Sequence, residues 1–132
     1  MTGAWIAEAA PRVALQAERE LEALVGVSTP SGDVAGAEEA VALCVAFLPP
    51  EAQVERVECS TAGHAPDLIG RLAGAGTMRV LLLGHLDTVV AHSAHRPPER
   101  DGDRLTGSGA VDMKGGVALA LGVMRELAAR PE

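Results

Sequence analysis

The sequence is poor in lysine and aromatic residues, and each shortage argues against a class of partner. Lys114 is the sole lysine among 132 residues, and the formal net charge is −7. Phosphate binding relies on clustered Lys and Arg, so a polyanionic partner is disfavoured. One Trp, one Phe and no Tyr leave little aromatic surface for stacking on bases. We therefore expect no nucleic acid among the partners.

Paired cysteines, long apolar runs and a basic N-terminus are also missing. Cys44 and Cys59 lack the close spacing of a zinc knuckle, which favours two reduced thiols that behave as small apolar residues. Charges interrupt every apolar stretch before the ~20 residues that a membrane span needs. Glu8 precedes the first basic residue, the wrong order for an export signal. We expect a cytoplasmic protein without membrane contact.

What the sequence does contain is the composition of one globular domain, 48% apolar and 22% charged. Hydrophobic periodicity and turn residues predict the following elements. They are helices at residues 13–25 and 33–48, strands at residues 53–59, 67–72 and 78–84, and a last helix from about residue 115 onward. The glutamates of residues 18–22 are predicted to lie on a solvated helix face, and Asp33 is predicted to cap the second helix.

This order of elements implies an α/β fold in which helices pack on a mixed, partly parallel sheet. The apolar run at residues 80–83 suits a strand covered on both faces, so residues 78–84 are the predicted central strand. Residues 90–103, rich in His, Pro and charge, are predicted to form a long loop. Ligands in such sheets bind beyond the carboxyl ends of the strands, which directs attention to the residues after Gly84.

Two chemistry-bearing residues follow Gly84 directly. His85 and Asp87 are two apart on an extended chain, so their side chains point the same way. A metal-bound imidazole needs its second nitrogen held, and a carboxylate commonly does this. Asp87 stands in that position. The alternative is that both are ordinary polar residues where a strand enters solvent.

The second motif places Asp112 between glycine-flanked turns just before the last helix. A carboxylate is favoured at a helix N-terminus and can bridge two cations. The alternative is an ordinary helix cap. Gly115 and Gly116 are costly early helix residues, by ~1 kcal/mol each relative to alanine. They are better explained where the backbone passes close to another group.

Together these motifs resemble the zinc aminoacylase and carboxypeptidase family, which includes glutamate carboxypeptidase, acetylornithine deacetylase and succinyl-diaminopimelate desuccinylase. By position, the resemblance implies that His85 binds one metal, that Asp112 bridges two, and that Asp87 belongs to the catalytic machinery beside the histidine. It also implies a cis peptide bond between Asp112 and Met113. The likeness is carried by residues 24–32, 80–89 and 107–116, and residues 84–89 with the loop after them look closest to glutamate carboxypeptidase.

The resemblance further implies hydrolysis of an amide or peptide bond in a small peptide or N-acyl amino acid, with two zinc ions, or cobalt or manganese in their place. In complete members, paired glutamates and further ligands come later than the last residue here. We therefore expect residues 1–132 to be the N-terminal part of the catalytic domain, to bind zinc poorly and to be inactive alone. The missing remainder includes a lid domain that would also support dimerisation. If the sheet continues there, an exposed edge makes this piece prone to aggregation.

Three other interpretations remain open. His92 and His95, with His85 nearby in sequence, could form a separate histidine site. Residues 107–111 resemble the start of a nucleotide-binding fingerprint, although Asp112 stands where its last glycine belongs. A non-catalytic interaction module could also keep the same α/β fold.

Overall fold

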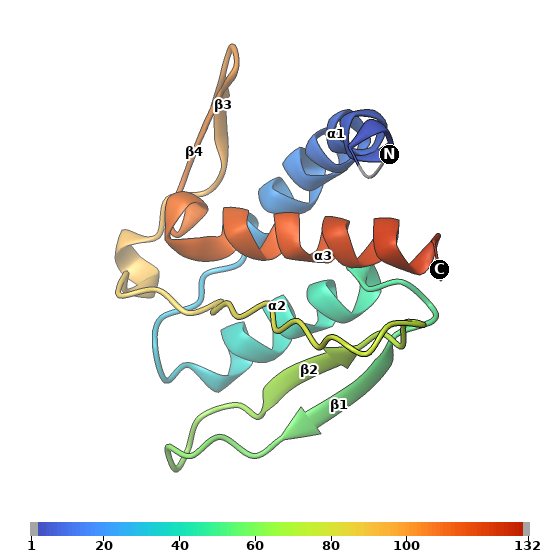
Figure 1. Ribbon diagram of the computed structural model, residues 1–132. Helices are drawn as coiled ribbons and strands as arrows, with labels where there is room; N and C mark the ends of the chain where they lie inside the picture. Colours follow the sequence, from blue (N-terminus) through green and yellow to red (C-terminus); the bar gives the residue numbers. More distant parts are fainter. Residues whose placement is uncertain (1–2, 131–132) are drawn as a thin grey trace.

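The computed structural model describes residues 3–130. It contains three α-helices, four short strands, a 3₁₀ turn (η1) and a π-helical turn (η2). They are α1 (Ala4–Gly26), α2 (Val34–Phe47), β1 (Gln53–Val57), β2 (Asp67–Arg71), η1 (His92–Ala94), β3 (Glu99–Asp101), β4 (Arg104–Thr106), η2 (Ala110–Lys114) and α3 (Gly115–Ala128). In Figure 1, α3 runs between α1 and α2, and the β1–β2 ribbon lies beyond α2. No helix within residues 3–130 is long and apolar enough to cross a lipid bilayer.

The helices form where the apolar pattern predicts them. Asp33 caps α2, since its Oδ2 accepts a 2.7 Å hydrogen bond from the Gly36 amide, and α2 ends at Phe47, shortly before two prolines. Helix α3 starts at Gly115, as predicted. Helix α1 begins at Ala4, well before the predicted start at residue 13, and includes Pro11. The extra turns are rich in alanine, which favours helix without an apolar stripe.

The core lies among the three helices. It is built from small and medium side chains, which let the helices approach closely: Ala17, Leu24, Cys44, Ala118 and Leu121. The prediction that Cys44 is a small buried residue is confirmed at 2% exposure. Glu20 corrects the prediction of a solvated glutamate face, because it is 5% exposed and pairs with Arg125 at 2.9 Å. The arginine sits on the facing helix and supplies the counter-charge that burial requires.

The α/β class is confirmed, but the predicted sheet is not. Both strand pairs are antiparallel: β1 with β2, and β3 with β4. The only parallel pairing in the described chain is an isolated bridge between Pro30 and Thr88.

The predicted central strand at residues 78–84 is wrong in the described structure. These residues belong to no helix or strand, and Met78, Leu81 and Leu83 are each more than four-fifths exposed. A strand forms only when a neighbour accepts and donates its backbone hydrogen bonds. Within residues 3–130, nothing pairs with this segment.

The predicted loop at residues 90–103 is also wrong in part, because β3 and β4 form a hairpin that begins inside it. Gly102 has φ +60° at its tip, and Gly102-Asp103 is a known two-residue hairpin signal. Arg100 ties the hairpin to α1 through a 2.6 Å contact with Glu22. The sequence pattern did not predict these short strands, because their side chains are largely charged and exposed.

Candidate metal site

The segment that carries His85 is held by a loop rather than by a sheet. Residues 86–88 hydrogen-bond to residues 29–31, which connect α1 to α2. The Thr88 amide donates to the Thr29 carbonyl at 2.8 Å, and the Ser31 amide donates to the Thr88 carbonyl at 2.9 Å. The Thr29 hydroxyl also donates to the Leu86 carbonyl at 2.7 Å. This loop therefore fixes the backbone on which His85 and Asp87 stand.

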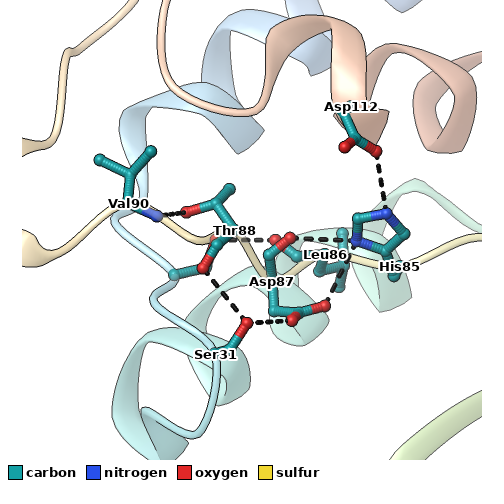
Figure 2. A network of polar contacts seen from close by, with 8 residues as sticks. Ser31, His85, Leu86, Asp87, Thr88, Val90 and Asp112 are labelled. Atoms are coloured by element: carbon teal, nitrogen blue, oxygen red, sulfur yellow. Dashed lines mark hydrogen bonds and ion pairs between the residues drawn. The ribbon is translucent and has the colours of Figure 1, made fainter.

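Both nitrogens of the His85 imidazole face an aspartate (Figure 2). Nδ1 lies 3.3 Å from Oδ1 of Asp87 and 3.0 Å from its backbone carbonyl oxygen. Nε2 lies 3.1 Å from Oδ1 of Asp112. The structure thus brings together all three residues that the sequence singled out, and Asp87 occupies the position expected of a group that orients the ring.

Neighbouring charges and hydrogen bonds affect the pKa of His85 more, taken together, than its partial burial does. Burial acts to lower the pKa of His85, but hydrogen bonds and charge from Asp87 and Asp112 leave the pKa raised above its ordinary value. The pKa of Asp87 is lowered, chiefly because the Ser31 hydroxyl donates a hydrogen bond to Oδ2. Ser31 is a site residue that sequence reasoning missed, because a serine in a turn carries no spacing signal.

Asp112 lies at an outward kink in η2. Its backbone is non-helical, with φ −118° and ψ 95°, and the predicted cis peptide bond to Met113 is present. Its carboxylate is 88% exposed. No side chain caps the start of α3, where Lys114 occupies the cap position. The alternative of an ordinary cap is therefore wrong, and the exposed carboxylate would repel a phosphate at residues 107–111.

Missing side chains allow the two motifs to meet. A Cβ on Gly84 would lie 2.9 Å from Cγ2 of Val117 and 3.3 Å from Cε of Met113. A Cβ on Gly115 would lie 2.8 Å from the Ala110 carbonyl oxygen. A Cβ on Gly116 would lie 3.1 Å from Cε of Met113, so both glycines lie where a side chain would meet a nearby group, as predicted. The Gly84 contacts bring the residue before His85 against the start of α3, whereas the Gly115 contact lies within the turn before that helix.

His92 faces groups other than the candidate ligands. Nδ1 of His92 lies 2.8 Å from the Ser28 hydroxyl oxygen, and its Nε2 lies 3.4 Å from Oδ1 of Asp33. Among residues 3–130, no group of three or more His, Cys, Asp or Glu side chains is arranged to hold a metal ion. Within this part of the chain, His85, His92 and His95 therefore do not form a three-ligand site.

Comparison with known proteins identifies the family. Residues 81–132 match the family described as "Peptidase family M20/M25/M40". Carboxypeptidase G2 of Pseudomonas sp. (strain RS-16) is similar, at 31% identity over 116 residues, which cover 83% of this chain and 27% of that protein. These comparisons support the assignment of this chain, as a partial chain, to this peptidase family. The chain thus spans about a quarter of the length of the curated relative it matches, and the resemblance to zinc aminoacylases and carboxypeptidases is confirmed.

The donor chemistry of His85 and Asp112 fits part of the metal site that such a peptidase requires. Imidazole nitrogen and carboxylate oxygen are common zinc ligands, and two ligand atoms around a tetrahedral ion lie about 3.3–3.5 Å apart when each bond is about 2.0–2.2 Å. The 3.1 Å between Nε2 and Oδ1 is close to that separation. This separation is compatible with both groups holding one ion.

Proposed function

We propose that the protein containing this chain hydrolyses an amide or peptide bond with the help of bound metal, as a carboxypeptidase or deacylase. The observation that carries the proposal is the 3.1 Å contact between Nε2 of His85 and Oδ1 of Asp112, two groups that lie 27 residues apart in sequence. Membership of a peptidase family supports the reaction type. The printed name of the relative, a carboxypeptidase, supports the carboxypeptidase form.

The proposed roles follow from what each side chain contacts. Nε2 of His85 and the Asp112 carboxylate would hold metal, and the resemblance to the family extends the proposed role of Asp112 to two zinc ions. Asp87 accepts a hydrogen bond from Nδ1–H, which would leave Nε2 free to bind metal. Ser31 donates to Asp87 and so restrains the carboxylate that orients the ring. Bound zinc would supply an activated water and polarise the scissile carbonyl.

The small number of candidate ligands supports the proposal that residues 1–132 are inactive alone. A catalytic zinc usually has three protein ligands and a water, whereas His85 and Asp112 supply two. We propose that the general base and the remaining ligands lie in the other part of the protein. The proposed substrates are small peptides or N-acyl amino acids. We also propose a cytoplasmic location and a dimer of the whole protein.

Zinc titration by calorimetry of the full chain tests the ligand assignment. Weak binding is expected, and H85A and D112N should each abolish it. H92A is the matched control, because it removes an exposed imidazole that contacts Ser28 and Asp33 instead. Tight binding that is lost in H85A would overturn the expectation of a weak site. Binding that survives H85A but is lost in H92A would overturn the site itself.

The reaction is tested on the longest reading frame that contains these residues. Zinc-loaded protein should release amino acids from N-acyl amino acids or short peptides, and H85A should reduce that rate by at least about 100-fold, the upper range seen for supporting residues of metal sites. If the frame encodes no further glutamate and histidine ligands and shows no hydrolysis, a non-catalytic interaction module is the better interpretation.

A further inference from the structure

The single lysine of the chain is buried at the end of α1. Lys114 has 0% exposure, and its ammonium group donates hydrogen bonds to the carbonyl oxygens of Leu24 at 2.9 Å and Val27 at 2.8 Å. A buried charge is costly unless it is hydrogen-bonded. The carbonyl end of a helix favours a cation, so α1 offers a suitable place for this one.

The backbone of Lys114 closes the turn that presents Asp112. Its amide donates to the Gly109 carbonyl at 2.9 Å. Ala110 and Lys114, at the two ends of η2, are buried, whereas Val111 between them is 95% exposed. The turn is thus anchored at both ends and projects its middle, including Asp112, outward.

Gly109, in the same turn, lies close to both the stem of Lys114 and Thr88 of the segment that carries His85. A Cβ on Gly109 would lie 3.4 Å from Cδ of Lys114 and 2.7 Å from Cγ2 of Thr88. Thr88 is bonded through its amide to Thr29, within the loop that holds residues 86–88. One buried side chain therefore contacts the end of α1 and the turn before α3, and Gly109 of that turn lies close to Thr88 of the histidine segment.

We propose that Lys114 is a positioning residue that holds the Asp112 carboxylate beside the His85 imidazole for a shared divalent cation. Lys114 acts through the turn and touches neither ion nor substrate. The inference rests on the proposed function, since it concerns the same metal site. It goes further in assigning a task to a side chain that contacts no ligand atom.

The variant that tests this role is K114M, which keeps an apolar stem and removes the donors. It leaves the carbonyl groups of Leu24 and Val27 without the ammonium, so some loss of stability is expected. R125M is the matched control. Arg125 also donates to a helix-end carbonyl, that of Phe47 at 2.6 Å, and pairs with buried Glu20, but it contacts none of the site residues.

The measurement is a cobalt(II) titration of the isotope-labelled full chain, followed through the paramagnetic broadening of the His85 ring signals. In K114M the midpoint should rise by about tenfold or more, the range seen when supporting residues of metal sites are removed. R125M should stay within about twofold of the unmodified chain. In the metal-free chain, the nuclear Overhauser contact between the His85 ring and the Asp112 methylene should weaken in K114M alone.

The possible failures are distinguishable. If cobalt(II) does not broaden His85 in the unmodified chain, the proposed metal site is wrong. If it does, and folded K114M keeps both the midpoint and the Overhauser contact, the positioning role is wrong. Equal shifts in K114M and R125M would show a general effect of stability and also overturn the role. If K114M does not fold, K114Q, which keeps a shorter donor group, is judged by the same criteria.

Discussion

Gly84 lies directly against Met113: a Cβ at position 84 would come within 3.3 Å of the methionine Cε. The residue before the candidate ligand His85 thus packs on the residue after the candidate ligand Asp112. The absence of a side chain at position 84 sets how closely the two motifs approach, so the contact links the packing of this region to the geometry of the site.

Replacing Gly84 with alanine should therefore destabilise the fold. The new methyl group would also lie 2.9 Å from Cγ2 of Val117, and overpacking of this kind typically costs about 1–3 kcal/mol. Urea unfolding of the full chain measures the change. G74A is the matched control, because a Cβ on Gly74 meets nothing within 4 Å. Equal unfolding free energies for both variants would contradict the close approach.

The two thiols should differ strongly in reactivity. Cys44 is 2% exposed, and burial, with a smaller effect of the Glu20 charge, raises its pKa to about 11. The thiolate is the reactive form, so a colorimetric thiol reagent should label Cys59 quickly and Cys44 only after denaturation. C59S should remove the fast phase. A fast phase that persists in C59S would show that the core around Cys44 opens readily.

Acid should weaken the start of α2. The pKa of Asp33 is lowered below 3.8, chiefly because it accepts the Gly36 amide hydrogen bond and secondly because His92 lies beside it. A carboxyl group with a depressed folded-state pKa contributes stability that is present above the unfolded pKa and is lost as pH falls through the folded one. Unfolding free energy should therefore fall below about pH 4, the unfolded value for Asp.

The variant D33N distinguishes the titration of the Asp33 carboxyl group from its role as the helix cap. Asparagine is also a good N-cap, so stability at neutral pH should change little, while the decrease in stability at acid pH should become shallower. Denaturant unfolding between pH 7 and pH 3 measures both. An unchanged acid slope in D33N would place the titrating group elsewhere.

The exposed apolar segment at residues 78–83 should drive self-association. Leu81 and Leu83 are each 82% exposed in a segment whose backbone has no strand partner in the described structure, and unpaired backbone of this kind templates intermolecular pairing. The double variant L81K/L83K should reduce aggregation in light scattering and size-exclusion chromatography. L15K is the matched control, since Leu15 is 58% exposed but lies in a helix. An equal gain in solubility from L15K would indicate general surface hydrophobicity instead.

The helices and the candidate site were predictable because their signals are local or chemical. Helical periodicity and the Asp33 cap depend on neighbouring residues, and His85, Asp87 and Asp112 carry rare chemistry at recognisable positions. The sheet was not predictable, because residues 78–84 have the composition of a central strand and only neighbouring strands could make them one. Ser31 and the buried Lys114 were missed as well, since their partners lie far away in sequence.

Residues 29–31 attach the backbone of residues 86–88 through hydrogen bonds that involve no strand of a sheet. The orientation of the imidazole is thereby uncoupled from the apolar stretch that precedes it. Solubilising substitutions upstream of Gly84 are therefore compatible with an intact pair of ligands, which makes the binding measurements feasible on a well-behaved variant.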